Sequence, residues 1–219
     1  MTQRTFRPAP PSTVQSQCYD LPMGWRGPAS VAGFVLAGGR SSRMGRDKAL
    51  IPYGDHTLLE HIARVVERAC GSVVLVGCPE RYRALPYPAI EDALPEQGPL
   101  GGIQAALCAS SAEWNLVVAC DMPLITVELL ESLLDAAQEC TGDCLVPVSP
   151  DGLLQPLCAL YRRRCLDTVS ALLGRGERKM RDAIPQLGAV LLPMSSAEAF
   201  RNLNTPQDWS ADWIVSPEP

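Results

Sequence analysis

The sequence predicts an α/β protein with a doubly wound, mainly parallel sheet. Three observations favour this class: short apolar runs of β-type residues, segments of helical period between them, and a length that suits one domain. The chain has 219 residues, of which 47% are hydrophobic and 20% are charged, as in an average globular protein. A chain of this length can bury a substantial core without disulfides or a structural metal.

The predicted strands are short apolar runs bounded by polar or turn-forming residues. In chain order they are residues 31–36, 72–77, 88–91, 114–120 and 144–148, with later candidates at 157–161 and 189–192. In open sheets of this kind, ligands bind beyond the carboxyl ends of the strands, where the strand order switches. The segments that follow these runs are therefore the places to search for a site.

Helices are predicted between the strands from apolar residues at helical spacing. One such stripe consists of Leu58, Ile62, Val65, Val66 and Ala69, and another of Leu130, Leu133, Leu134 and Ala137. Two helix starts carry local signatures. Residues 195–198 have capping-box spacing, and residues 205–208 place Thr at the cap with Pro in the first turn.

One domain, residues 31–213, is expected between two tails. Residues 1–30 are rich in Pro, Ser and Gln and predict a flexible tail, and residues 214–219 form a short C-terminal tail. The chain shows no apolar h-region and no run of bilayer length, so we expect a cytoplasmic protein without a membrane segment. Its net charge of −5 argues against a nucleic-acid binder.

The nine cysteines form no recognisable framework. No CxxC is present, and the closest pair is Cys140 and Cys144. Cysteines within apolar runs, such as Cys158, are typical of buried reduced thiols. The two histidines, His56 and His61, would lie on different faces of a helix. A histidine metal site is therefore not expected.

The strongest chemical signal directly follows the first predicted strand. Residues 36–48 read LAGGRSSRMGRDK, and Ala37, Gly38 and Gly39 would let backbone amides approach a ligand. Small residues, hydroxyl donors and cations after a first strand suit a triphosphate. The segment has neither Walker A nor GxGxxG spacing. The alternative is a plain glycine-rich turn with a solvated basic face.

Asp121 follows the fourth apolar run. A carboxylate at the end of a buried strand is costly unless something neutralises it. Mg²⁺ is commonly held by one or two carboxylates together with substrate phosphates. Asp121 is therefore a candidate Mg²⁺ ligand, and the alternative is a helix-capping aspartate.

Three further segments follow the same logic but are weaker. Residues 90–92 end a short strand with carboxylates, residues 98–102 (GPLGG) would open a helix, and residues 202–206 place two amides before a capped helix. Each of them alone fits a turn or a cap as well as a site.

Taken together, these strings resemble the molybdenum cofactor guanylyltransferases of the MobA family. The resemblance covers about residues 31–209 and implies a Rossmann-like nucleotidyltransferase fold. The matching strings, in the order in which they occur in the family, are LAGGRSSRMGRDK at 36–48, IED at 90–92, GPLGG at 98–102, CDMP at 120–123, QPLCALY at 155–161 and NLNTP at 202–206.

The resemblance also implies roles for the matching residues. The nucleotide would be bound by Leu36, Ala37, Gly38, Gly39, Lys48, Asp92, Gly98 and Asp121. Lys48, Arg43 and Asp121 would serve catalysis, with Asp121 as the Mg²⁺ ligand, and Asn202 and Asn204 would lie on the acceptor side. Two segments receive no role: residues 76–78, where some family members have an asparagine, and the extension at residues 1–30.

The reaction implied by the resemblance is attack of molybdopterin phosphate on the α-phosphorus of GTP, with pyrophosphate leaving. A phosphate monoester has its second pKa near ~6, so the nucleophile is mostly ionised at neutral pH and requires no general base. Charge neutralisation and in-line positioning are what the protein must supply. Asp47 would orient Lys48 or cap a turn. The expected partners are GTP, molybdopterin, and proteins that deliver or receive the cofactor.

Three alternatives stay open at this point. A relative that uses CTP, or a sugar phosphate as acceptor, would share the glycine-rich loop and Asp121. A regulatory nucleotide-binding module could lose Asp121 or Lys48 and keep its fold, whereas this chain has both. A nicotinamide-dependent reductase would need a glycine fingerprint that this chain lacks.

Overall fold

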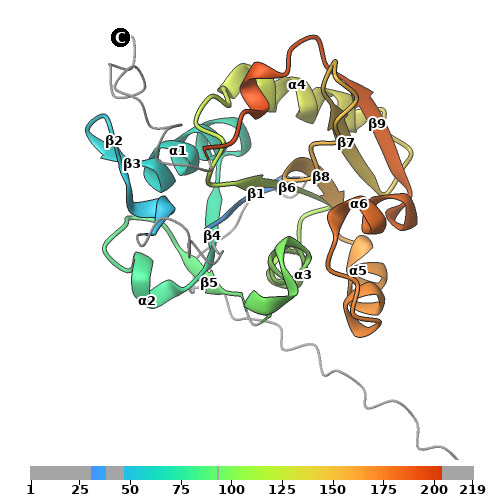
Figure 1. Cartoon of the computed structure of the whole chain (residues 1–219), viewed down its shortest axis with the longest axis horizontal. Helices are drawn as coiled ribbons and strands as arrows, with labels where there is room; N and C mark the ends of the chain where they lie inside the picture. Colours follow the sequence, from blue (N-terminus) through green and yellow to red (C-terminus); the bar gives the residue numbers. More distant parts are fainter. Residues whose placement is uncertain (1–30, 38–46, 93, 204–219) are drawn as a thin grey trace, which may run out of the picture.

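A seven-stranded sheet forms the centre of the protein (Figure 1). The computed structural model describes residues 31–37, 47–92 and 94–203. The strand order is β5-β4-β1-β6-β8-β7-β9. The strands are β1 (Val31–Leu36), β4 (Val73–Gly77), β5 (Ala89–Glu91), β6 (Trp114–Ala119), β7 (Cys144–Val148), β8 (Cys158–Arg162) and β9 (Ala189–Pro193). All seven runs predicted as strands are confirmed, with small differences at their ends.

The sheet is mainly parallel, as predicted. β1 pairs in parallel with β4 and β6, β4 with β5, and β7 with β9. Only β8 runs against its neighbours β6 and β7. The chain leaves β1 toward β4 and β5 and then returns to β6 on the other side of β1. The strand order therefore switches between β1 and β6, which makes the carboxyl ends of these two strands the expected place for a ligand.

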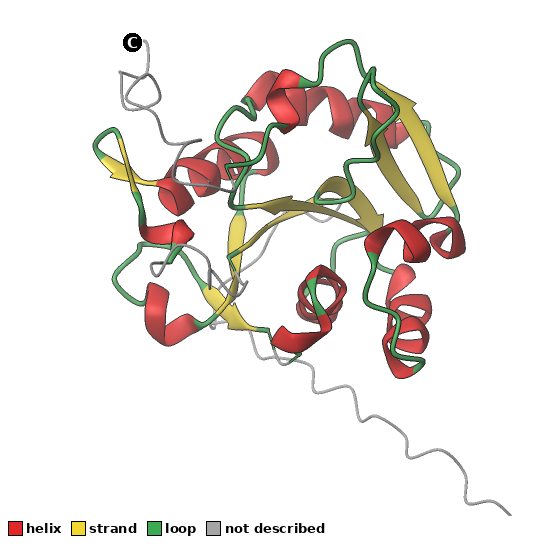
Figure 2. Ribbon diagram, in the orientation of Figure 1, coloured by secondary structure: helices red, strands yellow, loops and turns green. Residues whose placement is uncertain are grey.

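Helices cover both faces of the sheet (Figure 2). One face carries α1 (Leu58–Cys70) and α4 (Val127–Gln138), and the other carries α3 (Pro99–Ala109), α5 (Cys165–Gly174) and α6 (Met180–Ala183). Apolar spacing in the sequence predicts α1 and α4, and the GPLGG string predicts α3. The remaining short elements are η1 (Lys48–Leu50), β2 (Pro52–Tyr53), β3 (His56–Thr57), α2 (Pro79–Tyr82), η2 (Pro95–Gln97), η3 (Ile184–Leu187) and η4 (Glu198–Phe200).

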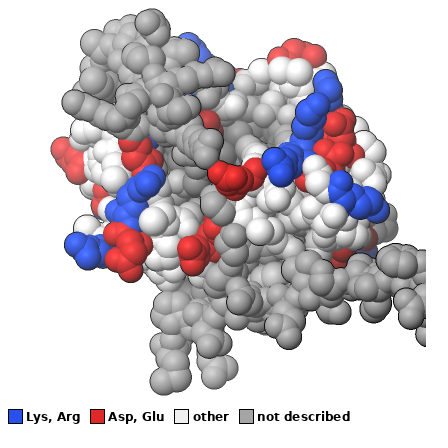
Figure 3. All heavy atoms as spheres, turned by 60° about the horizontal axis from the view of Figure 1, so that its bottom comes forward, with Lys and Arg blue, Asp and Glu red and all other residues white. Residues whose placement is uncertain are grey.

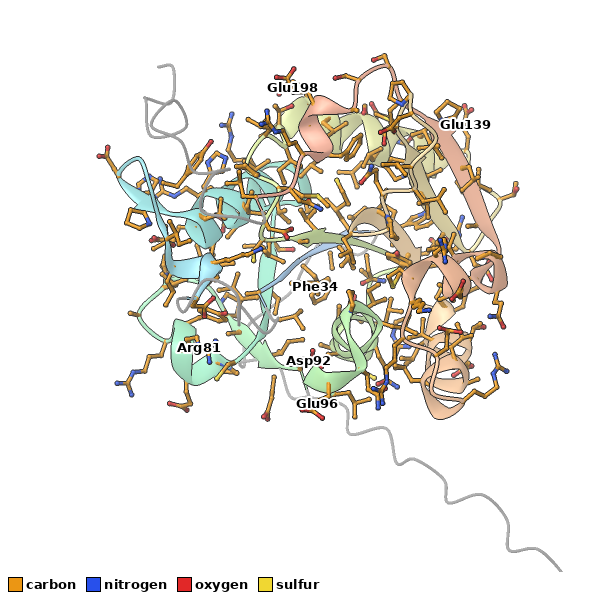
Figure 4. All side chains as sticks on the ribbon, in the orientation of Figure 1. Phe34, Arg81, Asp92, Glu96, Glu139 and Glu198 are labelled. Atoms are coloured by element: carbon orange, nitrogen blue, oxygen red, sulfur yellow. The ribbon has the colours of Figure 1, made fainter. Side chains whose placement is uncertain are left out.

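Alternation along the strands divides the interior into two apolar cores. In β1, Val35 belongs to the core beneath α1 and α4, whereas Phe34 and Leu36 belong to the core beside α3 and α5. The labelled Phe34 lies at the centre of the molecule in Figure 4. Successive side chains of a strand point to opposite faces, so a central strand that is covered on both sides is apolar throughout. This explains why β1 and β6 appear in the sequence as continuous apolar runs.

Helix α1 begins with a capping box. The Thr57 hydroxyl accepts a hydrogen bond from the Glu60 amide (3.2 Å), and the Glu60 carboxylate accepts one from the Thr57 amide (2.9 Å). The helix ends at Gly71, whose φ of +74° is the left-handed conformation that glycine adopts most readily. These two signals fix both ends of the helix that packs directly on β1.

The capping box predicted at residues 195–198 is wrong. Glu198 begins only the 3₁₀ turn η4, and its N-cap is Ala197. The turn ends at Phe200, Arg201 is extended, and the Leu203 amide donates a hydrogen bond to the Asp121 carbonyl (2.9 Å) instead of continuing a helix. The helix start predicted at residues 205–208 lies outside the described residues.

All eight cysteines within the described ranges are free, and five of them are buried. Burial raises the pKa of the Cys158 thiol to about 12, so this thiol stays protonated at neutral pH. No helix in the described ranges is both long and apolar enough to cross a lipid bilayer.

Gly33→Ala is expected to destabilise the fold. A Cβ at this position in β1 would lie 2.5 Å from Val66 Cγ1 and 2.6 Å from the Ser72 carbonyl oxygen, so α1 would have to move away from the sheet. Overpacking of this kind costs about 1–3 kcal/mol of unfolding free energy, measurable by urea denaturation. Gly174→Ala is the matched control, because a Cβ there meets nothing within 4 Å. Equal stabilities of the two variants would contradict the packing argument.

Candidate active site

The candidate site lies where β1 and β6 end side by side. The Cys120 amide, one residue beyond β6, donates a hydrogen bond to the Leu36 carbonyl at the end of β1 (3.1 Å). On the other side of β1, the Ala37 amide donates to the Val76 carbonyl (2.8 Å). The sheet thus holds the first residues of the glycine-rich segment and Asp121 next to each other, at the switch in strand order.

Lys48, the first residue of η1, also lies at this site. Its Nζ donates a hydrogen bond to the Leu203 carbonyl (3.1 Å), although the two residues are 155 positions apart. The Leu203 amide in turn donates to the Asp121 carbonyl (2.9 Å). Lys48, Asp121 and Leu203 therefore meet from three distant parts of the chain.

The Asp121 carboxyl is partly buried at the sheet edge. Burial raises its pKa above the ordinary value, and the nearby Lys48 ammonium acts in the opposite direction. The carboxylate therefore carries a desolvation cost that a cation would offset. Within the described ranges, no cluster of three or more His, Cys, Asp or Glu could hold a metal ion. A partly buried carboxylate of this kind could hold Mg²⁺, which binds one or two protein carboxylates together with phosphates and water.

Asp92 and Gly98 lie at the edge of the sheet beside α3. The Asp92 amide donates to the Gly77 carbonyl (2.9 Å), and its Oδ1 accepts from the Leu94 amide (2.9 Å). Burial raises the pKa of the Asp92 carboxyl. Figure 4 shows Asp92 beside the start of α3, on the same side of the molecule as Arg81. Gly98 precedes α3 with φ +66°, a conformation that favours glycine.

The remaining glycines of GPLGG allow α3 to approach β1 closely. A Cβ on Gly101 would lie 2.7 Å from the Leu94 carbonyl oxygen, and a Cβ on Gly102 would lie 3.1 Å from Leu36 Cδ2. The Leu36 side chain is only 8% exposed. It therefore packs beneath the start of α3, and a contact from Leu36 to a nucleotide remains a prediction.

The other predicted site residues are placed only in part. Asn202 is exposed next to Leu203, so it lies beside the segment that joins Lys48 to Asp121. Its role on the acceptor side remains a prediction. Gly38, Gly39, Arg43 and Asn204 lie outside the described residues, and their roles remain predictions as well.

Asp47 lies near the site and makes contacts that the motifs alone do not predict. Asp47 caps η1, because its Oδ1 accepts a hydrogen bond from the Ala49 amide (3.1 Å). Its other oxygen, Oδ2, accepts from Arg81 (2.9 Å) and from the Tyr82 hydroxyl (3.2 Å). Asp47 therefore caps the turn whose first residue is Lys48, as one of its two expected roles requires. Arg81 and Tyr82 belong to α2, and the local sequence signal for this helix is Pro79 in its first turn.

Acidic and basic side chains of described residues are mixed on the face drawn in Figure 3. Among the described residues of that face, no continuous basic surface is present that would attract polyanions in general.

Comparison with protein families and curated proteins gives consistent matches. The model of the MobA-like NTP transferase domain matches residues 33–190. A protein of Mycobacterium tuberculosis named "Probable molybdenum cofactor guanylyltransferase" is 37% identical over 182 residues, which cover 80% of this chain and 89% of the relative. Relatives with the same name from Nostoc sp. and Flavobacterium johnsoniae are 36% and 32% identical, over 82% and 78% of this chain and 88% and 89% of their own length.

Solved structures share the fold. Molybdopterin-guanine dinucleotide biosynthesis protein A from Archaeoglobus fulgidus superimposes with a TM-score of 0.69 at 26% identity, covering 81% of this chain and 94% of that structure. The 2-C-methyl-D-erythritol 4-phosphate cytidylyltransferase from Thermus thermophilus has a TM-score of 0.62 at 18% identity, with 80% and 93% covered. The second likeness concerns the fold alone. The predicted Rossmann-like nucleotidyltransferase fold is confirmed.

Asp121→Asn is expected to stabilise the free protein slightly. The amide keeps the shape of the side chain but removes a partly desolvated negative charge, so the unfolding free energy should rise by up to about 1 kcal/mol. The measurement is thermal or urea unfolding at neutral pH in the presence of a chelator. Glu131→Gln on the exposed side of α4 is the control for loss of one charge. A clear loss of stability in Asp121→Asn alone would show that the carboxylate serves the fold.

Proposed function

This chain belongs to the MobA-like NTP transferase family, and we propose that it transfers the guanylyl group of GTP to the phosphate of molybdopterin and releases pyrophosphate. The product is the guanine dinucleotide form of the cofactor. Support comes from relatives that are named "Probable molybdenum cofactor guanylyltransferase". They are 32–37% identical to this chain, and the matches cover most of their length. The chain also has the residues that such a reaction needs.

The observation that carries the proposal is the meeting of Lys48 and Asp121 at the switch in strand order. Asp121 follows the carboxyl end of β6, and the Lys48 ammonium reaches the same place through the carbonyl of Leu203, whose amide bonds to the Asp121 main chain. Phosphoryl and nucleotidyl transfer depend on charge neutralisation and in-line positioning rather than on covalent catalysis. Lys48 and Asp121 supply one charge of each sign for this purpose.

Each residue has a defined task in the proposed mechanism. Lys48 would bind phosphate oxygens of GTP and leave its present contact with the Leu203 carbonyl. The glycine-rich segment that begins at Ala37 would present backbone amides to the phosphates. No proton need be removed from the nucleophile, because the acceptor phosphate is largely ionised at neutral pH. The protein therefore contributes orientation and charge.

Asp121 would be the residue that holds Mg²⁺. When bound there, the ion would supply Lewis-acid stabilisation of the negative charge that develops on the leaving pyrophosphate. Asp92 and Gly98 would lie by the nucleotide, and Asn202 would lie toward the acceptor. Arg43, Gly38, Gly39 and Asn204 are assigned to the same site from the family resemblance alone.

The cellular setting follows from this chemistry. We propose a cytoplasmic enzyme that works without a membrane or a nucleic acid and exchanges its cofactor with other proteins. Its partners would be the protein that supplies molybdopterin and the proteins that receive the product. Pull-down of cofactor-loaded partners tests this part of the proposal.

Asp121→Asn is expected to abolish guanylyl transfer while leaving the fold intact. A neutral amide is a poor Mg²⁺ ligand, so the loss in turnover should be at least ~10²-fold, as for removal of a principal electrostatic stabiliser. The assay is pyrophosphate release with GTP and purified molybdopterin across a range of Mg²⁺ concentrations. Turnover within a few-fold of wild type at ordinary Mg²⁺ would refute the assignment of Asp121 to the metal.

GTP is expected to be preferred over CTP as the donor. Cytidylyl relatives tend to carry a second alanine where this chain has Gly38, and the missing methyl group leaves room for a purine. A site that pairs with the polar edge of guanine would leave groups unpaired with cytosine, at roughly 1–3 kcal/mol each, which gives ~10–10³-fold discrimination. The measurement is kcat/KM for all four triphosphates. Equal values for GTP and CTP would overturn the guanylyl assignment and leave nucleotidyl transfer standing.

A further inference from the structure

Tyr82 links the end of β1 to the start of η1. Its side chain is buried in the core beneath α1 and is only 1% exposed. The hydroxyl lies 2.5 Å from the Ala37 carbonyl oxygen and 3.2 Å from Asp47 Oδ2. One phenolic group therefore contacts the last described residue of the β1 segment and the residue directly before Lys48.

Asp47 transmits this contact to η1. Its Oδ1 caps the 3₁₀ turn at the Ala49 amide, and its Oδ2 faces Tyr82 and Arg81. Both the Ala37 carbonyl and the Asp47 carboxylate are acceptors, and they converge on one hydroxyl. The single phenolic hydrogen serves both acceptors, in a short hydrogen bond to Ala37 and a longer one to Asp47.

Arg81 contacts the same carboxylate oxygen from the solvent side. Its side chain is 53% exposed, so its ion pair with Asp47 (2.9 Å) is screened by water and is expected to contribute little. Tyr82 differs from Arg81 in two respects, because it is buried and because it also reaches Ala37. The two neighbours in α2 therefore make a matched pair for experiments.

We propose that Tyr82 is a positioning residue that fixes Lys48 in the site by anchoring Asp47 to the Ala37 carbonyl. Lys48 follows Asp47 directly, and its Nζ reaches the Leu203 carbonyl from the turn that Asp47 caps. Tyr82 acts through this turn. The effect on guanylyl transfer rests on the proposed function, whereas the effect on the position of Lys48 does not.

Competitive acylation of lysines tests the position of Lys48 without any assay of activity. The chain has only two lysines, Lys48 and the exposed Lys179 of the segment before α6, so Lys179 is an internal standard. In Tyr82→Phe, the ratio of Lys48 to Lys179 labelling should rise several-fold over wild type. In Arg81→Ala the ratio should stay close to wild type. An unchanged ratio in Tyr82→Phe overturns the proposal.

Kinetics test the consequence for transfer. Tyr82→Phe should lower kcat/KM for GTP about tenfold, which corresponds to ~1.4 kcal/mol of transition-state stabilisation. In a Lys48→Ala background the same change should have almost no further effect, because Tyr82 acts through Lys48. A loss that adds fully to that of Lys48→Ala overturns the proposal, as does a loss of equal size in Arg81→Ala.

Asp47→Asn serves as a second variant where Tyr82→Phe fails to fold. In asparagine one of the two carboxylate oxygens becomes an NH₂ group, so either the Ala49 amide or the Tyr82 hydroxyl loses its acceptor, and labelling of Lys48 should rise here too. An unchanged labelling ratio in Asp47→Asn contradicts the anchor. If the wild type transfers no nucleotide at all, the proposed function fails, and the labelling result still decides the role of Tyr82.

Discussion

The backbone of Leu203 connects the Lys48 ammonium to the main chain of Asp121, and the site depends on these two residues. Its carbonyl accepts a hydrogen bond from the Lys48 ammonium, and its amide donates to the Asp121 carbonyl. A partly buried carboxylate and an ammonium are both costly when removed from water unless they find partners. Leu203 accepts from the ammonium and bonds only to the main chain of Asp121, which leaves the Asp121 carboxylate available for a cation. The rest of the fold serves to bring these three segments together.

Close packing around β1 provides the rigid base for this arrangement. Gly33 lets α1 approach one face of the strand, and Gly102 lets α3 approach the other. With helices so close on both sides, the end of β1 has little freedom to shift. Sites that need accurate positioning are best built on such elements, because a displacement of about 1 Å can cost ~10²-fold in rate. The glycines of the GPLGG string thus have a packing role besides any contact with a nucleotide.

The sequence predicts most of the sheet and part of the site, for physical reasons that differ. Strands such as β1 and β6 are buried on both faces, so their continuous apolar runs are strong signals. The end of the apolar run of β6 locates Asp121, and the motif at residues 36–48 identifies Lys48 as a candidate cation. The contact of Lys48 with Leu203 spans 155 residues and leaves no local signature. Tyr82 was missed for the same reason, since its partners Ala37 and Asp47 are 45 and 35 residues away.

The separation between Lys48 and Leu203 also has a consequence for biosynthesis. A ribosome makes the β1 side of the sheet first, and β1, β4 and β6 can pair while the later strands are still being translated. Leu203, however, follows β9 and η4, so it is added after every strand of the sheet has been made. The nascent chain therefore acquires most of its architecture before Leu203 can contact Lys48 and Asp121, and the site is completed late in synthesis.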